Sequence, residues 1–327
     1  PCGGITLRVD EKVRITIVGA GFMGHGIGQE FALSGHEVVL HDLSDEKLRE
    51  AVDRIERNLR RLARWGLVAA EKIEPALERL RTTSSLEDAA RDADFVVEAV
   101  FEDLELKQQV FRNLDTFCPG RTILASNTST FMPSLLASVT KRPDRVLVAH
   151  YFYPPSLLPL VEVVPSAFTS GETVDAVCEI LSATGKSPII IRKEAVGFIA
   201  NRLQFALQRE ALHIVEQGIA TAQDVDIAVR DGFGRRLAVA GPFEIAEPIG
   251  WDLELRIQRN LFPHLAASPE PSPLVAEKVE RGEIGVKTGK GFYDWTPETA
   301  EAWRVEMERA LSRFVGDGES RAWCGDR

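Results

Sequence analysis

Glycines spaced Gly-x-Gly-x-x-Gly follow directly on an apolar run near the start of the chain, in Ile15-Thr-Ile-Val-Gly-Ala-Gly-Phe-Met-Gly24. The run predicts a strand, and the glycines predict the turn that joins this strand to a helix. Gly19 can adopt the backbone angles of a tight turn, Gly21 leaves room for a pyrophosphate beside the main chain, and Gly24 lets the helix lie against the strand. The free N–H groups at the start of that helix would face the phosphates. We therefore expect a dinucleotide to contact this segment, at Gly19, Gly21, Phe22, Met23 and Gly24.

A second strand-like run, His36-Glu-Val-Val-Leu-His-Asp42, ends in an acid. Asp42 follows the glycines at the spacing, roughly twenty residues, at which a carboxylate accepts hydrogen bonds from the adenosine ribose hydroxyls. A 2′-phosphate would be repelled there, and Leu43 and Ser44 supply no arginine to hold it. The sequence therefore predicts NAD rather than NADP as the cofactor. The alternative is that Asp42 only caps the helix that follows the strand.

Short apolar runs alternate with helix-like segments over the part of the chain before residue 195. After the first two runs, others lie at residues 94–100, 122–126, 145–150 and 187–193. This alternation is typical of right-handed βαβ units and a mainly parallel sheet, which binds ligands at the carboxyl ends of its strands. We predict an α/β fold with a Rossmann-type, doubly wound, mainly parallel sheet.

The pattern becomes helical from Gly197 on, and no further strand is expected. Helices are expected at residues 198–217, 222–231, 242–262 and 273–281. The sequence thus predicts a Rossmann domain over residues 11–195, an all-α C-terminal domain over residues 196–297 and a helical extension over residues 298–327.

Charge and cysteine spacing argue against several classes of protein. A net charge of −10 would repel the phosphate backbone of a nucleic acid, so we expect no such partner. The four cysteines are scattered and have no histidine at metal-binding spacing, so we expect no metal site and a reducing, cytoplasmic setting. No apolar run approaches the roughly 18 residues of a membrane-spanning helix, and we expect no association with a membrane.

Residues 45–66 have the pattern of a strongly two-sided helix. One face is apolar and carries Val52, Ile55, Leu59 and Leu62 at helical spacing. The opposite face is basic and carries Arg54, Arg57, Arg61 and Arg64. The basic face is either a solvated surface or a patch that binds the phosphates of a large substrate. In the second interpretation, Arg57 and Arg61 would contact the substrate.

A histidine and a glutamate could together serve as an acid–base pair. His150 ends a strand-like run, and Glu162 follows in Leu160-Val-Glu-Val-Val164. Oxidation of a hydroxyl group needs a base that takes the proton while hydride leaves, and the pKa of histidine suits this task near neutrality. A carboxylate on the other ring nitrogen would fix the tautomer and stabilise the imidazolium. The alternative is that His150 is a hydrogen-bonded structural residue.

Six motifs in order resemble those of the L-3-hydroxyacyl-CoA dehydrogenase family. They extend from about Val13 to Trp295 and comprise Gly19-Ala-Gly-Phe-Met-Gly24, Ser126-Asn-Thr-Ser129, His150-Tyr-Phe-Tyr-Pro154 with Leu160-Val-Glu-Val163, Gly197-Phe-Ile-Ala-Asn-Arg202, Gly241-Pro-Phe-Glu244 and Lys287-Thr-Gly-Lys-Gly-Phe-Tyr293. Six motifs in order are far more specific than any one of them.

The resemblance implies a role for each matching residue. His150 would be the general base and Glu162 its orienting partner, whereas Ser129 and Asn201 would form hydrogen bonds around the 3-oxygen of the substrate. Contacts with the nicotinamide side of the cofactor would come from Glu102, Lys107 and Lys287, and Ser129 would also contact the cofactor. The resemblance also implies NAD as the cofactor, an acyl-CoA as the small-molecule substrate, a place in fatty acid metabolism and a homodimer formed through the second domain.

Three positions depart from the family pattern. The usual His-Phe-Phe-Asn-Pro is here His-Tyr-Phe-Tyr-Pro, so that Tyr153 replaces a cofactor-side asparagine. Asn58 and Trp65 stand where relatives place a serine and a lysine against CoA. The segments Pro154–Glu162 and Gly197–Leu207 also resemble the λ-crystallin and L-gulonate 3-dehydrogenase branch. Two alternatives therefore stay open: a dehydrogenase of a free 3-hydroxy acid such as L-gulonate or 3-hydroxybutyrate, and a crystallin-like cofactor-binding protein without turnover.

Overall fold

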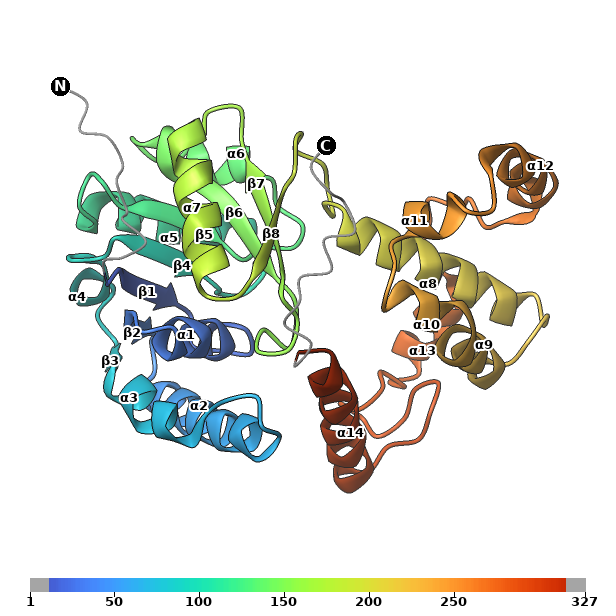
Figure 1. The fold of residues 1–327 in the computed structure, drawn as a ribbon, viewed down its shortest axis with the longest axis horizontal. Helices are drawn as coiled ribbons and strands as arrows, with labels where there is room; N and C mark the ends of the chain where they lie inside the picture. The colour runs from blue at the N-terminus through green and yellow to red at the C-terminus, as the bar shows by residue number, and fades with distance from the viewer. Residues whose placement is uncertain (1–11, 316–327) are drawn as a thin grey trace. The chain divides into compact units, whose positions relative to one another are not determined.

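The computed structural model describes residues 12–315 (Figure 1). Contacts between Cα atoms divide these residues into two units. The first unit comprises residues 12–199 together with residues 305–315, and the second comprises residues 200–304.

The first unit is built on one sheet of eight strands in the order β3-β2-β1-β4-β5-β6-β7-β8. Their bounds are β1 (Arg14–Val18), β2 (Glu37–His41), β3 (Leu80–Thr83), β4 (Phe95–Glu98), β5 (Ile123–Ser126), β6 (Val146–Tyr151), β7 (Leu160–Pro165) and β8 (Ser187–Ile190). Every neighbouring pair is parallel except β6 and β7, which are antiparallel. The prediction of a doubly wound, mainly parallel sheet followed by helices is confirmed.

Helices pack on both faces of this sheet, because side chains of successive strand residues point to opposite faces. In β4, Phe95 and Val97 join one apolar core, whereas Val96 joins the other. The first core also takes side chains from α1 (Gly24–Leu33), α2 (Asp45–Arg64), α3 (Ile73–Glu78) and α7 (Gly171–Ala183), and the second from α4 (Leu86–Ala90), α5 (Leu104–Phe117) and α6 (Pro133–Ala137). Two short 3-10 turns lie at Ala70–Lys72 and Pro143–Arg145.

Helix α2 has the two-sided character that its sequence predicts. Its buried side chains are Leu48, Ala51, Ile55, Leu59 and Leu62. The hydroxyl of Ser44 accepts a hydrogen bond from the Lys47 N–H and so caps the start of the helix. The arginines of the opposite face are therefore held on a rigid helix rather than on a loop.

The second unit is helical, as expected. It contains α8 (Ala200–Glu216), α9 (Ala222–Ala228), a π-turn (Val229–Phe233), α10 (Gly234–Leu237), α11 (Pro242–Ala246), α12 (Trp251–Leu261), a 3-10 turn (Phe262–His264) and α13 (Pro273–Glu280). The single helix expected over residues 242–262 was wrong, because Gly250 adopts a φ of 90° between α11 and α12. Helix α14 (Pro297–Val315) begins in the second unit and ends in the first. Of the helices in the described part of the chain, none is both long and apolar enough to span a membrane.

Candidate active site

The turn after β1 has the shape that a dinucleotide requires. Gly19 adopts a φ of 99°, and a Cβ there would lie 2.6 Å from the carbonyl oxygen of Ala99. A Cβ on Gly24 would overlap the carbonyl oxygen of Gly19, whereas a Cβ on Gly21 would meet no atom within 4 Å. Gly19 and Gly24 thus allow the turn to close, and the open space at Gly21 suits a pyrophosphate close to the main chain.

Asp42 lies beside this turn, at the end of β2. One of its carboxylate oxygens accepts a hydrogen bond from the Ala20 N–H at 3.1 Å, and the Gly19 N–H donates to the carbonyl oxygen of His41 at 2.8 Å. Because the carboxylate is only half-buried, its other oxygen can accept hydrogen bonds from a ligand.

The antiparallel register of β6 and β7 brings the predicted histidine and glutamate together. His150 is the register partner of Glu162, so the two side chains are cross-strand neighbours. The Nδ1 atom of His150 lies 2.8 Å from one carboxylate oxygen of Glu162, and the other oxygen accepts a hydrogen bond from the Ile199 N–H at 2.9 Å. Both side chains are buried. With Nδ1–H donating to a carboxylate, Nε2 of the neutral ring is the atom that can accept a proton.

Aromatic rings enclose this histidine. The ring centroid of Phe152 lies 4.5 Å from that of His150, and the centroid of Phe198 lies 5.6 Å away. Phe198 is buried and has a φ of 49°, a conformation that a phenylalanine rarely adopts. The backbone at the entrance to α8 is therefore held in an unfavourable conformation that seats Phe198 against the imidazole.

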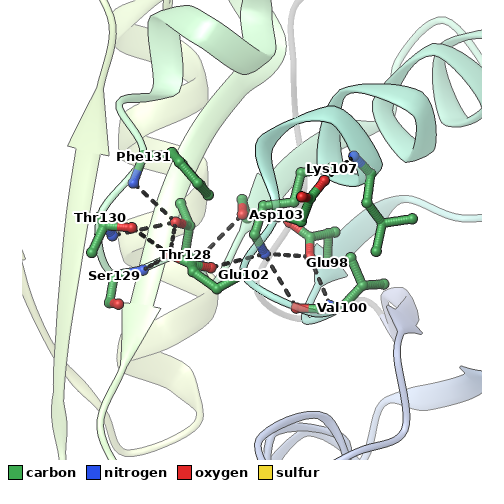
Figure 2. A network of polar contacts seen from close by, with 11 residues as sticks. Glu98, Val100, Glu102, Asp103, Lys107, Thr128, Ser129, Thr130 and Phe131 are labelled. Atoms are coloured by element: carbon green, nitrogen blue, oxygen red, sulfur yellow. Dashed lines mark hydrogen bonds and ion pairs between the residues drawn. The ribbon is translucent and has the colours of Figure 1, made fainter. Parts of the chain in front are cut away.

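A second polar cluster lies at the carboxyl ends of β4 and β5 (Figure 2). At its centre is Lys107, whose buried ammonium lies 2.8 Å from Glu98, 3.3 Å from Glu102 and 3.3 Å from the carbonyl oxygen of Val100. Glu98 is fully buried and also accepts hydrogen bonds from the Val100 N–H at 2.7 Å and from the Ser126 hydroxyl at 2.5 Å. The charge of Lys107 is thus neutralised by two carboxylates of the protein itself.

Glu102 fixes the loop that carries Ser129. Its carboxylate accepts hydrogen bonds from the hydroxyls of Thr128 and Thr130, at 2.5 and 2.8 Å, and from the Ser129 N–H at 3.2 Å (Figure 2). Burial opposes its ionisation, but the hydrogen bonds from Thr128 and Thr130 and the charge of Lys107 outweigh this effect and lower the pKa of Glu102. Glu102 is therefore an anion that holds the backbone of Ser129 in place.

The loop with Ser129 is also tied to the strand that carries His150. The side-chain oxygen of Asn127 accepts a hydrogen bond from the Tyr151 N–H at 2.8 Å. Ser129 itself is half-buried. The sequence predicts Glu102, Lys107 and Ser129 as site residues but gives no role to Glu98 or Thr128. The hydrogen bonds of Glu98 with Ser126 and of Thr128 with Glu102 join residues that are far apart in the sequence.

Comparisons with known proteins match both parts of the chain. The NAD binding domain of 3-hydroxyacyl-CoA dehydrogenase matches residues 14–195, and the C-terminal domain of the same family matches residues 197–295. The chain belongs to the 3-hydroxyacyl-CoA dehydrogenase family. The sequence resemblance is thereby confirmed.

The relatives in this family are named for different substrates. Human mitochondrial hydroxyacyl-coenzyme A dehydrogenase is 35% identical over 288 residues, which cover 86% of this chain and 90% of the relative. The 5-formyl-3-hydroxy-2-methylpyridine 4-carboxylate 5-dehydrogenase of Mesorhizobium japonicum is 31% identical over 299 residues, covering 91% and 95%.

Two solved structures repeat this contrast. A crystal structure of that pyridine carboxylate dehydrogenase, described as an NAD+ dependent dismutase, has a TM-score of 0.87 at 30% identity, covering 93% of this chain and 97% of the other. The (S)-3-hydroxybutyryl-CoA dehydrogenase of Ralstonia eutropha has a TM-score of 0.72 at 32% identity, covering 88% and 100%.

This family member is an NAD-dependent dehydrogenase. The glycine turn and the acid at Asp42 fit the cofactor, because they offer an open phosphate site and a carboxylate beside it. Phe22, within the turn, is exposed and stacks on Tyr153 with ring centroids 4.2 Å apart. Met23, also within the turn, packs against the first apolar core.

Two predicted residues of this family member belong to the second unit. Asn201 lies in the first turn of α8, and Lys287 is an exposed residue between Gly285 and Lys290, which are joined by a β-bridge. The roles implied for Asn201 and Lys287 stay predictions.

The basic face of α2 is partly used within the protein. Arg61 forms an ion pair of 2.7 Å with Glu308 of α14, which lies outside both matched family domains. Arg54 pairs with Glu50 at 3.0 Å, whereas Arg57 is exposed. The arginines of the predicted phosphate patch therefore lie in different environments. Of Arg57 and Arg61, the two residues predicted to contact the substrate, only Arg57 is exposed to solvent.

Proposed function

We propose that this dehydrogenase oxidises the 3-hydroxyl group of an L-3-hydroxyacyl substrate to a ketone, with His150 as the base. The buried pair of His150 and Glu162 is the observation that carries the proposal. Nε2 of His150 takes the proton from the 3-hydroxyl oxygen while hydride leaves the carbon that carries this hydroxyl group. The imidazolium that forms is stabilised by Glu162, which lies 2.8 Å from Nδ1. NAD supplies the acceptor for the hydride.

Ser129 and Asn201 are proposed to hold the 3-oxygen of the substrate. The anchoring of the Ser129 backbone by Glu102 supports this role, because a fixed hydrogen-bonding group needs no reorganisation during the reaction. Asn201 would supply the second group from the helical unit. Of the residues proposed for the nicotinamide side, Lys107 is already neutralised, so we expect it to act by fixing Glu102.

The proposal also concerns the group to which the hydroxyacyl chain of the substrate is attached. A CoA thioester is the first candidate, because several relatives are named as hydroxyacyl-CoA dehydrogenases and because Arg57 and Arg61 could meet its phosphates. A small acid without CoA is the second candidate. It is favoured by the relative named for a pyridine carboxylate and by the ion pair that engages Arg61.

We also propose that the protein is a homodimer formed through its second unit. None of the described residues of α8, α9, α12 and α13 is buried. Large apolar side chains of α8 and α12 are exposed, among them Leu203, Phe205, Leu253 and Ile257. A helical unit that buries so little apolar surface needs a partner, and a second copy would provide it. Light scattering should give twice the monomer mass.

The free thiols of Cys118 and Cys178 support a reducing, cytoplasmic setting.

Formation of NADH with a substrate panel tests the proposed reaction. The panel contains (S)- and (R)-3-hydroxybutyryl-CoA, free 3-hydroxybutyrate and L-gulonate, at saturating NAD. We expect turnover of the (S)-thioester and none of its enantiomer. If a free acid gives a higher kcat/KM than the thioester, the second candidate is correct. If no member of the panel is oxidised, the proposed reaction is wrong.

A further inference from the structure

The carboxylate of Glu308 is buried on α14, beyond the two family domains. Only 2% of its side chain is exposed, and it lies 2.7 Å from the guanidinium of Arg61. It also accepts a hydrogen bond of 3.3 Å from the Tyr153 hydroxyl. A buried carboxylate is stable only where cations and hydrogen-bond donors compensate its lost hydration, so this contact fixes the second half of α14 on the first unit.

Arg61 is held on several sides. Its guanidinium donates to the side-chain oxygen of Asn58 at 2.9 Å and lies 5.5 Å from the ring centroid of Trp65. The side chain is 21% exposed. A phosphate that approached Arg61 would therefore have to displace Glu308 or meet the repulsion of its negative charge.

Glu308 also connects this arginine with the cofactor turn. Tyr153 lies in the loop between β6 and β7, the strands that carry His150 and Glu162. Its ring stacks on Phe22 of the glycine turn, with an interplanar angle of 26°. One carboxylate thus contacts both the basic face of α2 and the aromatic pair at the glycine turn.

We propose that Glu308 is a specificity-determining residue that removes Arg61 from the recognition of anionic substrates. The dehydrogenase then recognises the hydroxyacyl group without a phosphate contact from Arg61. Of the two candidate carriers, this favours the one without phosphates, such as a short thioester or a free acid. This inference rests on the proposed reaction and concerns only which part of the substrate is bound.

Two thioesters of the same acid test the inference. (S)-3-Hydroxybutyryl-CoA carries the phosphates, whereas the N-acetylcysteamine thioester of (S)-3-hydroxybutyrate has the same reacting end without them. In the parent protein we expect similar kcat/KM values for the two. Glu308→Gln keeps a hydrogen-bonding group but frees the charge of Arg61. It should lower KM for the CoA thioester roughly tenfold to hundredfold, the effect of one charge-assisted hydrogen bond, and leave KM for the short thioester unchanged.

Two further variants separate this effect from a change in overall charge. Glu306 is exposed on the same helix, so Glu306→Gln removes one negative charge without touching Arg61 and should leave both KM values unchanged. Adding Arg61→Ala to Glu308→Gln should bring KM for the CoA thioester back up.

The outcomes distinguish the inference from the proposed reaction. If the parent protein oxidises neither thioester, the proposed reaction fails. If the parent prefers the CoA thioester more than about tenfold, its phosphates are recognised and the inference is wrong. If Glu308→Gln folds, as judged by its thermal melt, and leaves the ratio of the two kcat/KM values unchanged, the inference is also wrong. The parent comparison needs no variant, so the inference stays testable if Glu308→Gln does not fold.

Discussion

The ammonium of Lys107 lies 2.8 Å from the carboxylate of Glu98, and both side chains are almost completely buried. The pair joins α5 to the end of β4, next to the loop that carries Ser129. Removing one member of such a pair leaves an uncompensated charge in the interior, which costs far more than the pair itself contributes. Both the stability of the first unit and the geometry of the Ser129 loop should therefore depend on Lys107.

Replacing Lys107 by methionine should strongly destabilise the protein. The carboxylate of Glu98 would stay buried without its cation, and we expect the free energy of unfolding to fall by about 3–5 kcal/mol in urea denaturation. Lys72→Met at an exposed position serves as the control and should change stability by no more than about 0.5 kcal/mol. Adding Glu98→Gln to Lys107→Met should recover part of the loss. Equal stability of Lys107→Met and the parent would show that the pair is not important for the fold.

Stability should decrease in mild acid because buried histidines resist protonation. Burial lowers the pKa of His36 below the ordinary value of 6.5. Below about pH 6.5 the unfolded chain therefore binds a proton that the folded chain does not, and the free energy of unfolding falls until the folded-state pKa is reached. Each such group contributes a slope of up to about 1.4 kcal/mol per pH unit. Burial also lowers the pKa values of His25 and His41, which act in the same direction.

His36→Gln isolates one of these contributions. Glutamine does not titrate in this range and can still accept the hydrogen bond that His36 receives from the Val13 N–H. Urea denaturation at about pH 7.5 and about pH 5.5 should show a smaller loss of stability for the variant than for the parent. The same loss in both proteins would mean that His36 titrates normally in the folded state.

Asp42 should determine the preference for NAD over NADP. Asp42→Ala removes an acceptor for the ribose hydroxyls, and charge-assisted hydrogen bonds contribute about 1.5–3 kcal/mol. We expect kcat/KM for NAD to fall roughly tenfold to hundredfold while kcat/KM for NADP changes little. Asp45→Ala, three residues later on an exposed position of α2, is the matched control. A parent protein that uses NADP as well as NAD would refute this role.

The sequence predicted the elements whose signals are local. The glycine turn, the apolar runs of β1, β4 and β5 and the two-sided α2 each follow from neighbouring residues. Strand β3 was not predicted, because Leu80-Arg-Thr-Thr83 pairs at the edge of the sheet and lacks the apolar run of an interior strand.

Long-range contacts of the candidate site could not be predicted in the same way. The antiparallel pairing of β7 decides that Glu162 lies opposite His150, and no local pattern specifies the neighbour of a strand. The ion pair between Arg61 and Glu308 joins residues near opposite ends of the chain, and each residue alone looks like an ordinary charge on a helix surface. The resemblance to the family identified the dyad but not Glu308, because this residue lies beyond the family domains.

Single-turnover formation of NADH by His150→Gln tests whether His150 is the base that takes the hydroxyl proton. With saturating NAD and the (S)-3-hydroxybutyryl thioester that the parent oxidises, the rate of the variant should fall by about 10²- to 10⁴-fold, because the proton of the hydroxyl group has no base. NAD affinity and the thermal melt should stay at their parental values. His264→Gln, at an exposed histidine, should react like the parent. A folded His150→Gln variant that forms NADH at the parental rate would show that His150 is not the base.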